Sequence, residues 1–361
     1  MLSTSESSAP RFRLIRKISV FLVAAVWVCG GLVSEIRAAS YTWTGLGAND
    51  NWSDAGNWEG GPDSPGLGDT AEFASVTPRL HSVMDSPLTI SGIAYSVPGY
   101  SLSVLAPLTI TGGIAADSAN GPELLVDGAL SLGGDALVTS LSGTGSVSLD
   151  AHALTVSQSG TFSGTISGTG GSLVKSGTGT LTILGVGEYT GATTVAAGTL
   201  QVDGTIVSDV AVQDGAILGG DGLVGSIVLE SGAVLIPVGC FDGEDLTWHS
   251  GATMIYDLGV DVGILELTGD LLKGSGSSFS FTFQDGDWQV GETYPLIFFN
   301  ATTFAEGDFH FTNGGGFDGD FVLEENALRF TLTAVPEPSS GVLGLAGLVL
   351  ACVCYRRARR D

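Results

Sequence analysis

Short alternations of apolar and polar residues, separated by glycine-rich turns, run through most of the chain. Leu-Thr-Ile stands at 88–90 and again at 108–110, and similar apolar-Thr-apolar triplets stand at 154–156 and 181–183. A period of two places alternate side chains on opposite faces of a β-strand. No helical period is sustained between the two terminal segments. The pattern therefore predicts an all-β protein built from short strands.

The predicted strands recur at a nearly constant spacing. Segment 86–92 returns at 106–112, and segment 214–218 is echoed at 231–235. This repeat is too short for a propeller blade and contains no helix, whereas it suits one rung of a parallel β-helix. We expect a right-handed parallel β-helix over residues 86–239, with Leu, Val and Ile stacked inside and Thr and Ser outside.

Aromatic residues mark both ends of this repeat region. Ten of the sixteen Phe residues lie between positions 279 and 321, which predicts an antiparallel β cap region over residues 240–334. Residues 40–85 hold Trp43, Trp52 and Trp58 among turn-forming residues. We expect this segment to be an N-terminal cap, because the open end of a repeat stack must be covered. The alternative is a sugar-binding platform, since flat indole rings stack on the apolar faces of sugars.

Residues 1–39 have the order of a secretory signal peptide. A basic stretch at 11–17 precedes an apolar run at 18–33, and small residues follow at Ala38 and Ala39. Basic, apolar and small-residue regions in this order predict export and cleavage near Ala38 or Ala39. An uncleaved N-terminal membrane anchor is the alternative.

The C-terminal segment 335–361 also has three parts. Pro336-Glu337-Pro338 precedes an apolar stretch, which predicts a transmembrane helix over 339–355, near the lower length limit for crossing a bilayer. Four arginines follow and should hold the tail on the cytoplasmic side of the membrane: Arg356, Arg357, Arg359 and Arg360. A plain C-terminal anchor with a proline-rich stem is the alternative.

Residues 335–361 resemble the PEP-CTERM protein-sorting signal in the order of these three parts. The resemblance implies export in a Gram-negative-type bacterium and processing by an exosortase-type enzyme. Proline disfavours helix in the residue before it, so the Pro-Glu-Pro motif should be extended and able to enter a protease cleft.

Residues 170–204 closely resemble the autotransporter-associated β-strand repeat. The matching blocks are Lys-Ser-Gly-Thr-Gly-Thr-Leu-Thr-Ile, Tyr-Thr-Gly-Ala-Thr-Thr-Val and Gly-Thr-Leu-Gln-Val. The resemblance implies a passenger-like β-helix at the cell surface. The chain ends in one apolar segment rather than in an outer-membrane barrel pattern, so we expect the sorting tail to take the anchoring role.

Charge separates the body of the chain from its ends. The whole chain has 13 Lys and Arg against 38 Asp and Glu, a net charge of −25. Residues 39–335 keep four basic and 34 acidic residues, a net charge of 4 − 34 = −30. Nucleic-acid binding needs clustered Lys and Arg, so the composition excludes it. Cys240 is the one cysteine of this body, which excludes an intramolecular disulfide framework there.

Candidate chemistry is sparse. The four histidines are scattered without metal-ligand spacing, and no Gly-x-Ser-x-Gly motif is present. Asp-Gly clusters at 242–245, 285–287 and 318–320 do not fit a twelve-residue Ca²⁺ loop. We therefore expect no catalytic residue, no bound metal site and no cofactor, with weak Ca²⁺ binding by the acidic turns as an alternative.

These observations indicate an exported structural or adhesive protein, an adhesin-like component of the cell envelope or extracellular matrix. We expect a membrane-anchored precursor that then reaches the cell surface or the matrix. The expected partners are the Sec translocon, an exosortase-type processing enzyme and extracellular polysaccharide. A polysaccharide-degrading β-helix enzyme and a carbohydrate-binding surface module are the alternatives.

Overall fold

The computed structural model describes residues 38–61, 63–257, 263–284, 289–313 and 317–334. The predicted signal peptide lies outside these ranges except for Ala38 and Ala39, and the predicted helix at 339–355 lies outside them entirely. Across the described ranges, no helix combines the length and apolar character that crossing a membrane requires.

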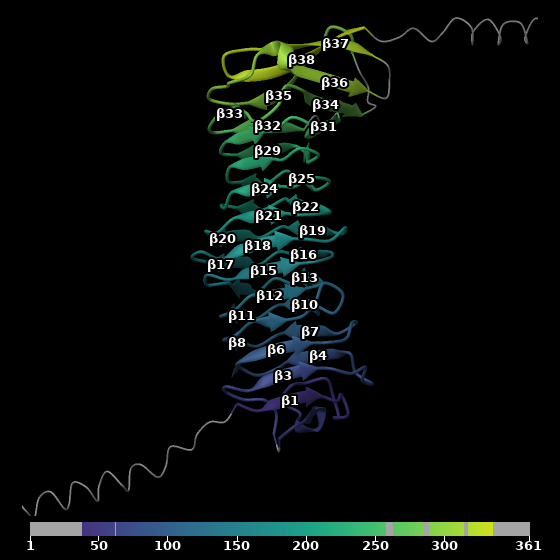
Figure 1. Cartoon of the computed structure of the whole chain (residues 1–361), viewed down its shortest axis with the longest axis vertical. Coiled ribbons are helices and arrows are strands. Elements are labelled where there is room, and N and C mark those ends of the chain that lie inside the picture. Colours follow the sequence, from purple (N-terminus) through teal and green to yellow (C-terminus); the bar gives the residue numbers. More distant parts are fainter. Residues whose placement is uncertain (1–37, 62, 258–262, 285–288, 314–316, 335–361) are drawn as a thin grey trace, which may run out of the picture. The chain divides into compact units, whose positions relative to one another are not determined.

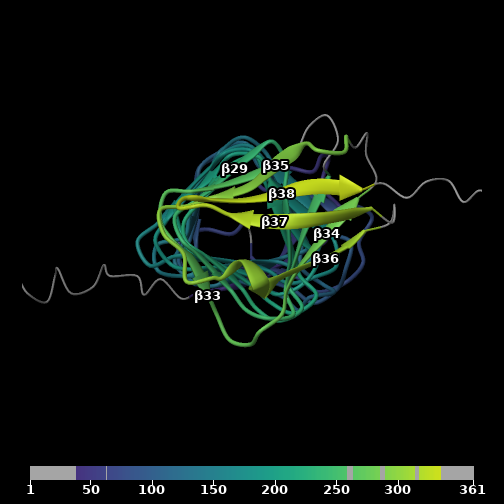
Figure 2. The same ribbon diagram turned by 90° about the horizontal axis from the view of Figure 1, so that it is seen from above.

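From Ala39 onward the chain winds into a parallel β-solenoid of about ten turns (Figure 1), which confirms the predicted fold class. The solenoid begins before residue 86, where the sequence predicted its start, because residues 40–42 already pair in parallel with residues 70–72. Each regular turn contributes one short strand to each of three faces, which we call face 1, face 2 and face 3. Figure 2 shows the stacked turns from above, with the strands arranged around a common interior. Two short 3-10 helices, η1 (Ala55–Asn57) and η2 (Glu306–Asp308), lie near the two ends of the solenoid.

Face 1 is a 13-stranded sheet among the described residues, and its spatial order is β2 (Trp58–Glu59), β1 (Ser40–Trp43), β3 (Thr70–Phe73), β6 (Gly92–Tyr95), β9 (Ile114–Ala115), β12 (Ala136–Val138), β15 (Ala153–Val156), β18 (Ser172–Lys175), β21 (Thr193–Val195), β24 (Val210–Val212), β27 (Ile227–Leu229), β30 (Leu246–Trp248) and β33 (Leu271–Lys273).

Face 2 consists, within the same described ranges, of a four-stranded and an eight-stranded sheet joined by the bridge between Gly143 and Phe162. The smaller sheet has the order β13 (Ser140–Ser142), β10 (Glu123–Val126), β7 (Ser101–Val104) and β4 (His81–Met84). The larger has the order β16 (Gly160–Phe162), β19 (Thr180–Ile183), β22 (Thr199–Val202), β25 (Ile217–Gly220), β28 (Val234–Pro237), β31 (Thr253–Asp257), β34 (Phe279–Gln284) and β36 (Phe309–Asn313).

Face 3 is a second 13-stranded sheet in the described part of the chain, with the order β37 (Asp318–Leu323), β38 (Ala327–Ala334), β35 (Thr293–Phe298), β32 (Ile264–Leu267), β29 (Cys240–Gly243), β26 (Leu223–Val224), β23 (Thr205–Ile206), β20 (Val186–Tyr189), β17 (Thr165–Gly168), β14 (Ser146–Ser148), β11 (Ala129–Leu132), β8 (Leu108–Ile110) and β5 (Leu88–Ile90).

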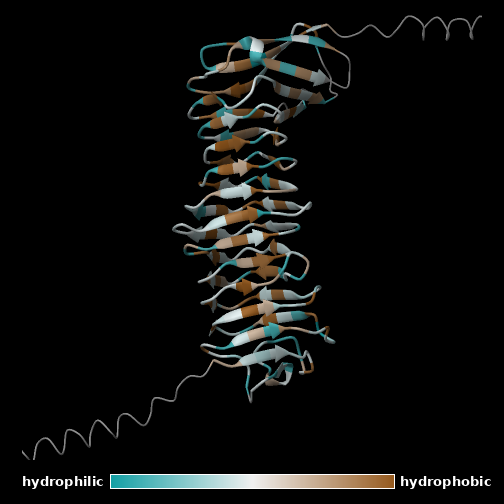
Figure 3. Ribbon diagram, in the orientation of Figure 1, coloured by the Kyte–Doolittle hydropathy of each residue, from teal (hydrophilic) through white to brown (hydrophobic). Residues whose placement is uncertain are grey.

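The interior is a set of side-chain ladders that run along the rod. On face 2, Leu181 is in register with Leu200, Leu200 with Leu218, and Leu218 with Leu235, and all four are fully buried. Figure 3 shows such apolar positions recurring in strand after strand, with hydrophilic residues at the turns. Full burial of one leucine contributes about 1.5–3 kcal/mol relative to exposure, so each ladder stabilises the stacking of neighbouring turns.

Glycine is required at the corner between faces 2 and 3. Gly145, Gly164, Gly185, Gly204 and Gly222 stack there on successive turns. A Cβ atom on any of the last four would overlap the carbonyl oxygen of the glycine one turn earlier. The close backbone approach, rather than a left-handed conformation, therefore excludes side chains from this column.

The parallel part extends beyond residue 239, where the sequence predicted its end. Strands β31, β34 and β36 pair in parallel, and β32 pairs in parallel with both β29 and β35. At this end, antiparallel pairing among the described residues involves β35, β38 and β37, of which β37 and β38 lie across the end of the stack (Figure 2). An antiparallel region is therefore present, but it is smaller than the predicted span 240–334. The alternation of Phe279, Phe281 and Phe283 indicated a strand without indicating the direction of its neighbours.

Candidate functional site

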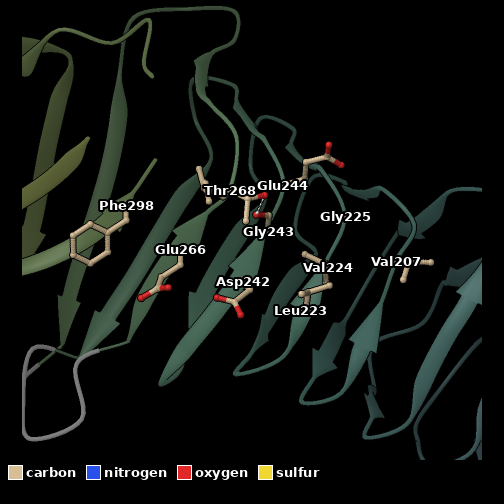
Figure 4. Close-up of a pocket in the computed structure, with 11 residues that line it drawn as sticks. Val207, Leu223, Val224, Gly225, Asp242, Gly243, Glu244, Glu266, Thr268 and Phe298 are labelled. Carbon is tan, nitrogen blue, oxygen red and sulfur yellow. Dashed lines mark hydrogen bonds between the residues drawn. The ribbon is translucent and has the colours of Figure 1, made fainter. Parts of the chain in front are cut away.

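A groove lies on face 3 of the solenoid. It has a volume of about 690 Å³ and crosses five successive strands from β23 to β35. Its lining consists of Val207, Leu223, Val224, Gly225, Asp242, Gly243, Glu244, Glu266, Leu267, Thr268 and Phe298. Figure 4 shows these residues on adjacent strands, with the carboxylates of Asp242 and Glu266 extending from the same side of the sheet.

Strand register assembles this groove. Leu223 pairs with Asp242, Asp242 with Glu266, and Glu266 with Phe298, so these four side chains form one row across four strands. Neighbouring strands lie about 4.8 Å apart, which brings each side chain of the row next to the following one. Each member of the row is separated in the sequence from the next by a full turn of the solenoid, and only the fold makes these residues neighbours.

The lining combines apolar and acidic surface. Val207 is 52% exposed and Leu223 is 42% exposed, while Val224 and Leu267 are buried beneath them. Asp242 is half-buried, and Glu244 and Glu266 are exposed. Like charges on directly adjacent strands repel each other, so the Asp242–Glu266 pair does not serve stability.

No basic residue in the described ranges forms an ion pair with these carboxylates. Arg79 pairs with Asp50, Lys273 with Asp308, and Arg329 with Glu324. Arg329 also lies over the Phe298 ring at 5.7 Å from its centroid, at the end of the groove. Lys175 is buried, and its Nζ donates hydrogen bonds to the carbonyl oxygens of Gly177 and Ala197.

Lys175 and a nearby hydroxyl cluster are buried polar features inside the repeat region. Burial lowers the pKa of the Lys175 ammonium group. One turn further, the hydroxyl of Tyr189 is 2.6 Å from Thr193 Oγ1, which is 2.7 Å from Ser208 Oγ. Burial raises the pKa of Tyr189 to about 12 although both hydrogen bonds oppose the shift. The three hydroxyl groups bond to one another and the Lys175 ammonium bonds to backbone carbonyl oxygens, so these polar groups are satisfied within the stack.

The three tryptophans of the predicted sugar-binding platform are buried. Trp43 is 0%, Trp52 1% and Trp58 6% exposed. The Trp58 ring contacts the other two edge-on, with ring centroids 5.1 Å from Trp43 and 5.0 Å from Trp52. Phe73 continues this cluster toward the solenoid at 5.8 Å from Trp43. A stacking platform does not fit this packing, because a sugar needs an accessible ring face.

The histidines do not come together. His81 Nδ1 is 2.8 Å from Ser101 Oγ, His249 Nδ1 is 2.9 Å from Ser275 Oγ, and His152 Nδ1 is 3.7 Å from Asp135. Each contact joins neighbouring turns of the solenoid. The described residues contain no group of three or more His, Cys, Asp or Glu that could hold a metal ion. Asp285 and Asp287 of one acidic turn lie outside the described residues.

The sorting residues also lie outside the described ranges. This applies to the motif Pro336-Glu337-Pro338 and to the four arginines expected to retain the precursor, Arg356, Arg357, Arg359 and Arg360. Their roles stay predictions from the sequence.

Two segments of the chain match models of known families. Residues 334–360 match the PEP-CTERM protein-sorting motif, and residues 173–202 match the passenger-associated-transport repeat. The second match spans β18 to β22 of the solenoid. No curated protein matches the chain. A sorting motif that follows a surface-type β-solenoid indicates an exported surface protein of a Gram-negative-type bacterium.

Proposed function

We propose that the chain is a non-catalytic spacer and adhesive protein of the cell envelope or extracellular matrix. The observation that carries this proposal is a parallel β-solenoid with an interior of stacked side chains in the described residues, followed in the sequence by a sorting motif. Such a rod can hold attached groups away from the membrane and present a long lateral surface to matrix polymers.

Sorting is proposed to proceed in two steps. The Sec translocon exports the chain, and the C-terminal apolar segment with its arginines then holds the precursor in the membrane. An exosortase-type enzyme acts at the Pro-Glu-Pro motif, and the acidic body reaches the surface or the matrix. A body charge of −30 favours solubility outside the cell and disfavours direct contact with anionic polymers.

Replacing the four tail arginines with glutamine tests the sorting step. The variant precursor should lose membrane retention and processing, because the positive charges that hold the tail on the cytoplasmic side are gone. The matched control replaces Arg79 and Arg329 with glutamine, which removes arginines of the body and leaves the tail intact. Processing of the tail variant at the wild-type rate, seen by a size shift on immunoblots, would contradict the sorting proposal.

A pull-down against matrix polymers isolated from the native cells tests the adhesive step. The full chain should be retained by the polymer fraction both with and without Ca²⁺. No retention under either condition would remove the adhesive part and leave a spacer.

A further inference from the structure

The face-3 groove runs across the strands rather than along one of them. Its lining residues come from β23, β26, β29, β32 and β35 or from the turns that follow them, so an occupant must lie parallel to the rod axis. Five strands at about 4.8 Å spacing make a footprint on the order of 19 Å long. This length suits several units of a linear polymer.

The sheet leaves no backbone groups free for a peptide. Strands β26, β29 and β32 each pair with a strand on both sides. A peptide laid across them could not add to a ladder, and its own N–H and C=O groups would need other partners. A glycan carries hydroxyl groups that water hydrates and C–H faces that pack on apolar side chains, so it meets no such requirement.

The negative charge of the groove determines which class of glycan it can bind. The row formed by Leu223, Asp242, Glu266 and Phe298 places two carboxylates between two apolar side chains, and Glu244 adds a third carboxylate. None of the three carboxylates has an ion-pair partner among the described residues. Anionic glycans would be repelled, whereas an ammonium group would form charge-assisted hydrogen bonds with these oxygens.

We propose that the face-3 groove binds a linear polysaccharide that carries free amino groups. Asp242 and Glu266 hold the ammonium groups, and Val207 and Leu223 pack against the apolar faces of the sugars. The inference deepens the adhesive function proposed above and rests on it, since it names the chemical class of the polymer.

The test is titration of the full chain, purified in a non-ionic detergent, with two oligosaccharides of equal length. One is an oligomer of glucosamine, and the other is the same oligomer with every amino group acetylated. Calorimetry should show binding of the amino form, weakened by added NaCl, and at least tenfold weaker binding of the acetylated form. Equal affinity for the two oligomers, or no binding of the amino form, would overturn the proposal.

Variants assign the binding to the groove. Asp242→Asn combined with Glu266→Gln should reduce affinity at least tenfold, and Leu223→Ser should reduce it severalfold. The matched control is Asp214→Asn combined with Glu230→Gln, which removes two acidic charges near the ends of β24 and β27 on face 1. An equal loss in the control would indicate general attraction to an acidic rod and would contradict a defined site.

Separate measurements test whether the variant is folded and whether a divalent cation takes part in binding. The Asp242→Asn/Glu266→Gln variant should keep the β-type circular dichroism spectrum and an equal or higher Tm, because it relieves like-charge repulsion. Binding should persist in EDTA, and loss of binding in EDTA would point to a bridging cation and overturn direct recognition.

Retention by native matrix without glucosamine-oligomer binding would refute the ligand class alone, whereas oligomer binding without matrix retention would refute the adhesive function.

Discussion

The middle of the solenoid and its C-terminal end close the same interior with different side chains. Across face 2, the ladder that begins with Leu181 continues through Leu235 to Met254, Phe281 and Phe311. The turns that join the last three of these positions are longer than the turns of the middle. A middle turn has neighbours on both sides, and an aliphatic side chain fills its position in this ladder. The last turns have one neighbour fewer and must also fill the end.

Aromatic rings supply the additional buried area at both ends. Phe281 contacts Trp248 at 5.2 Å and Phe321 at 5.1 Å between ring centroids, beneath strands β37 and β38. The tryptophan cluster does the same at the N-terminal end, around Phe73. Each aromatic side chain buries about 150–250 Å², which makes it the efficient choice where no further turn follows. The comparison shows that repetition stabilises the middle and that ring packing stabilises the ends.

The largest expected effect comes from the glycine column of the middle. Gly185→Val places a branched side chain against the backbone of Gly164, so neighbouring turns cannot stack at hydrogen-bonding distance. We expect the variant to lose the cooperative unfolding transition followed by circular dichroism. The control is Gly307→Ala at the C-terminal end, where a Cβ would have no heavy atom within 4 Å. A Gly185→Val protein as stable as Gly307→Ala would refute the close-approach argument.

Truncating the face-2 ladder at Phe281, near the C-terminal end, or at Leu200, in the middle, should lower the unfolding free energy by similar amounts. The two variants should differ in which strands lose protection from hydrogen exchange. Phe281→Ala should cost about 3–5 kcal/mol and Leu200→Ala about 2–5 kcal/mol of unfolding free energy. Because each turn contacts only its neighbours, Phe281→Ala should speed hydrogen exchange in β34 to β38 and leave β16 to β22 protected. Leu200→Ala should show the reverse pattern. Uniformly faster exchange in either variant would indicate a globally cooperative fold instead.

The smallest effect is the pH dependence at Lys175. Burial lowers the pKa of this group in the folded state, so the unfolded chain binds more protons between the folded pKa and 10.5. Unfolding free energy contributed by Lys175 therefore rises with pH across that window. Urea titrations from pH 7 to 10 give the unfolding free energies of wild type and Lys175→Met. The wild-type value relative to that of the variant should rise with pH. A constant difference across this range would mean that burial does not perturb the group.

Much of the fold is predictable from the sequence because the repeat leaves a local pattern. The return of Leu-Thr-Ile at 108–110 reports the turn length, and β5 and β8 do pair through Leu88–Leu108 and Ile90–Ile110. Longer turns at the C-terminal end hide the same repeat. Strand direction there depends on pairing across the fold, which alternation alone does not encode.

The groove was not predictable for a related reason. Leu223, Asp242 and Glu266 carry no local motif, and they become one row only through the register of three strands. The sequence does mark Asp242 and Glu244 as members of an acidic turn at 242–245, but the only chemistry that this turn suggests is weak Ca²⁺ binding. Conversely, tryptophans among glycine and asparagine fit both a cap and a platform in the sequence, and only their burial distinguishes the two.

Localisation of the body in native cells tests the central claim most directly. Antibodies raised against the solenoid should label intact, unpermeabilised cells or the isolated matrix, and fractionation should find a shortened chain there. The tail-arginine variant provides the internal comparison for sorting. A chain found at full length in the cytoplasm, with no label on intact cells, would contradict the account of an exported surface protein.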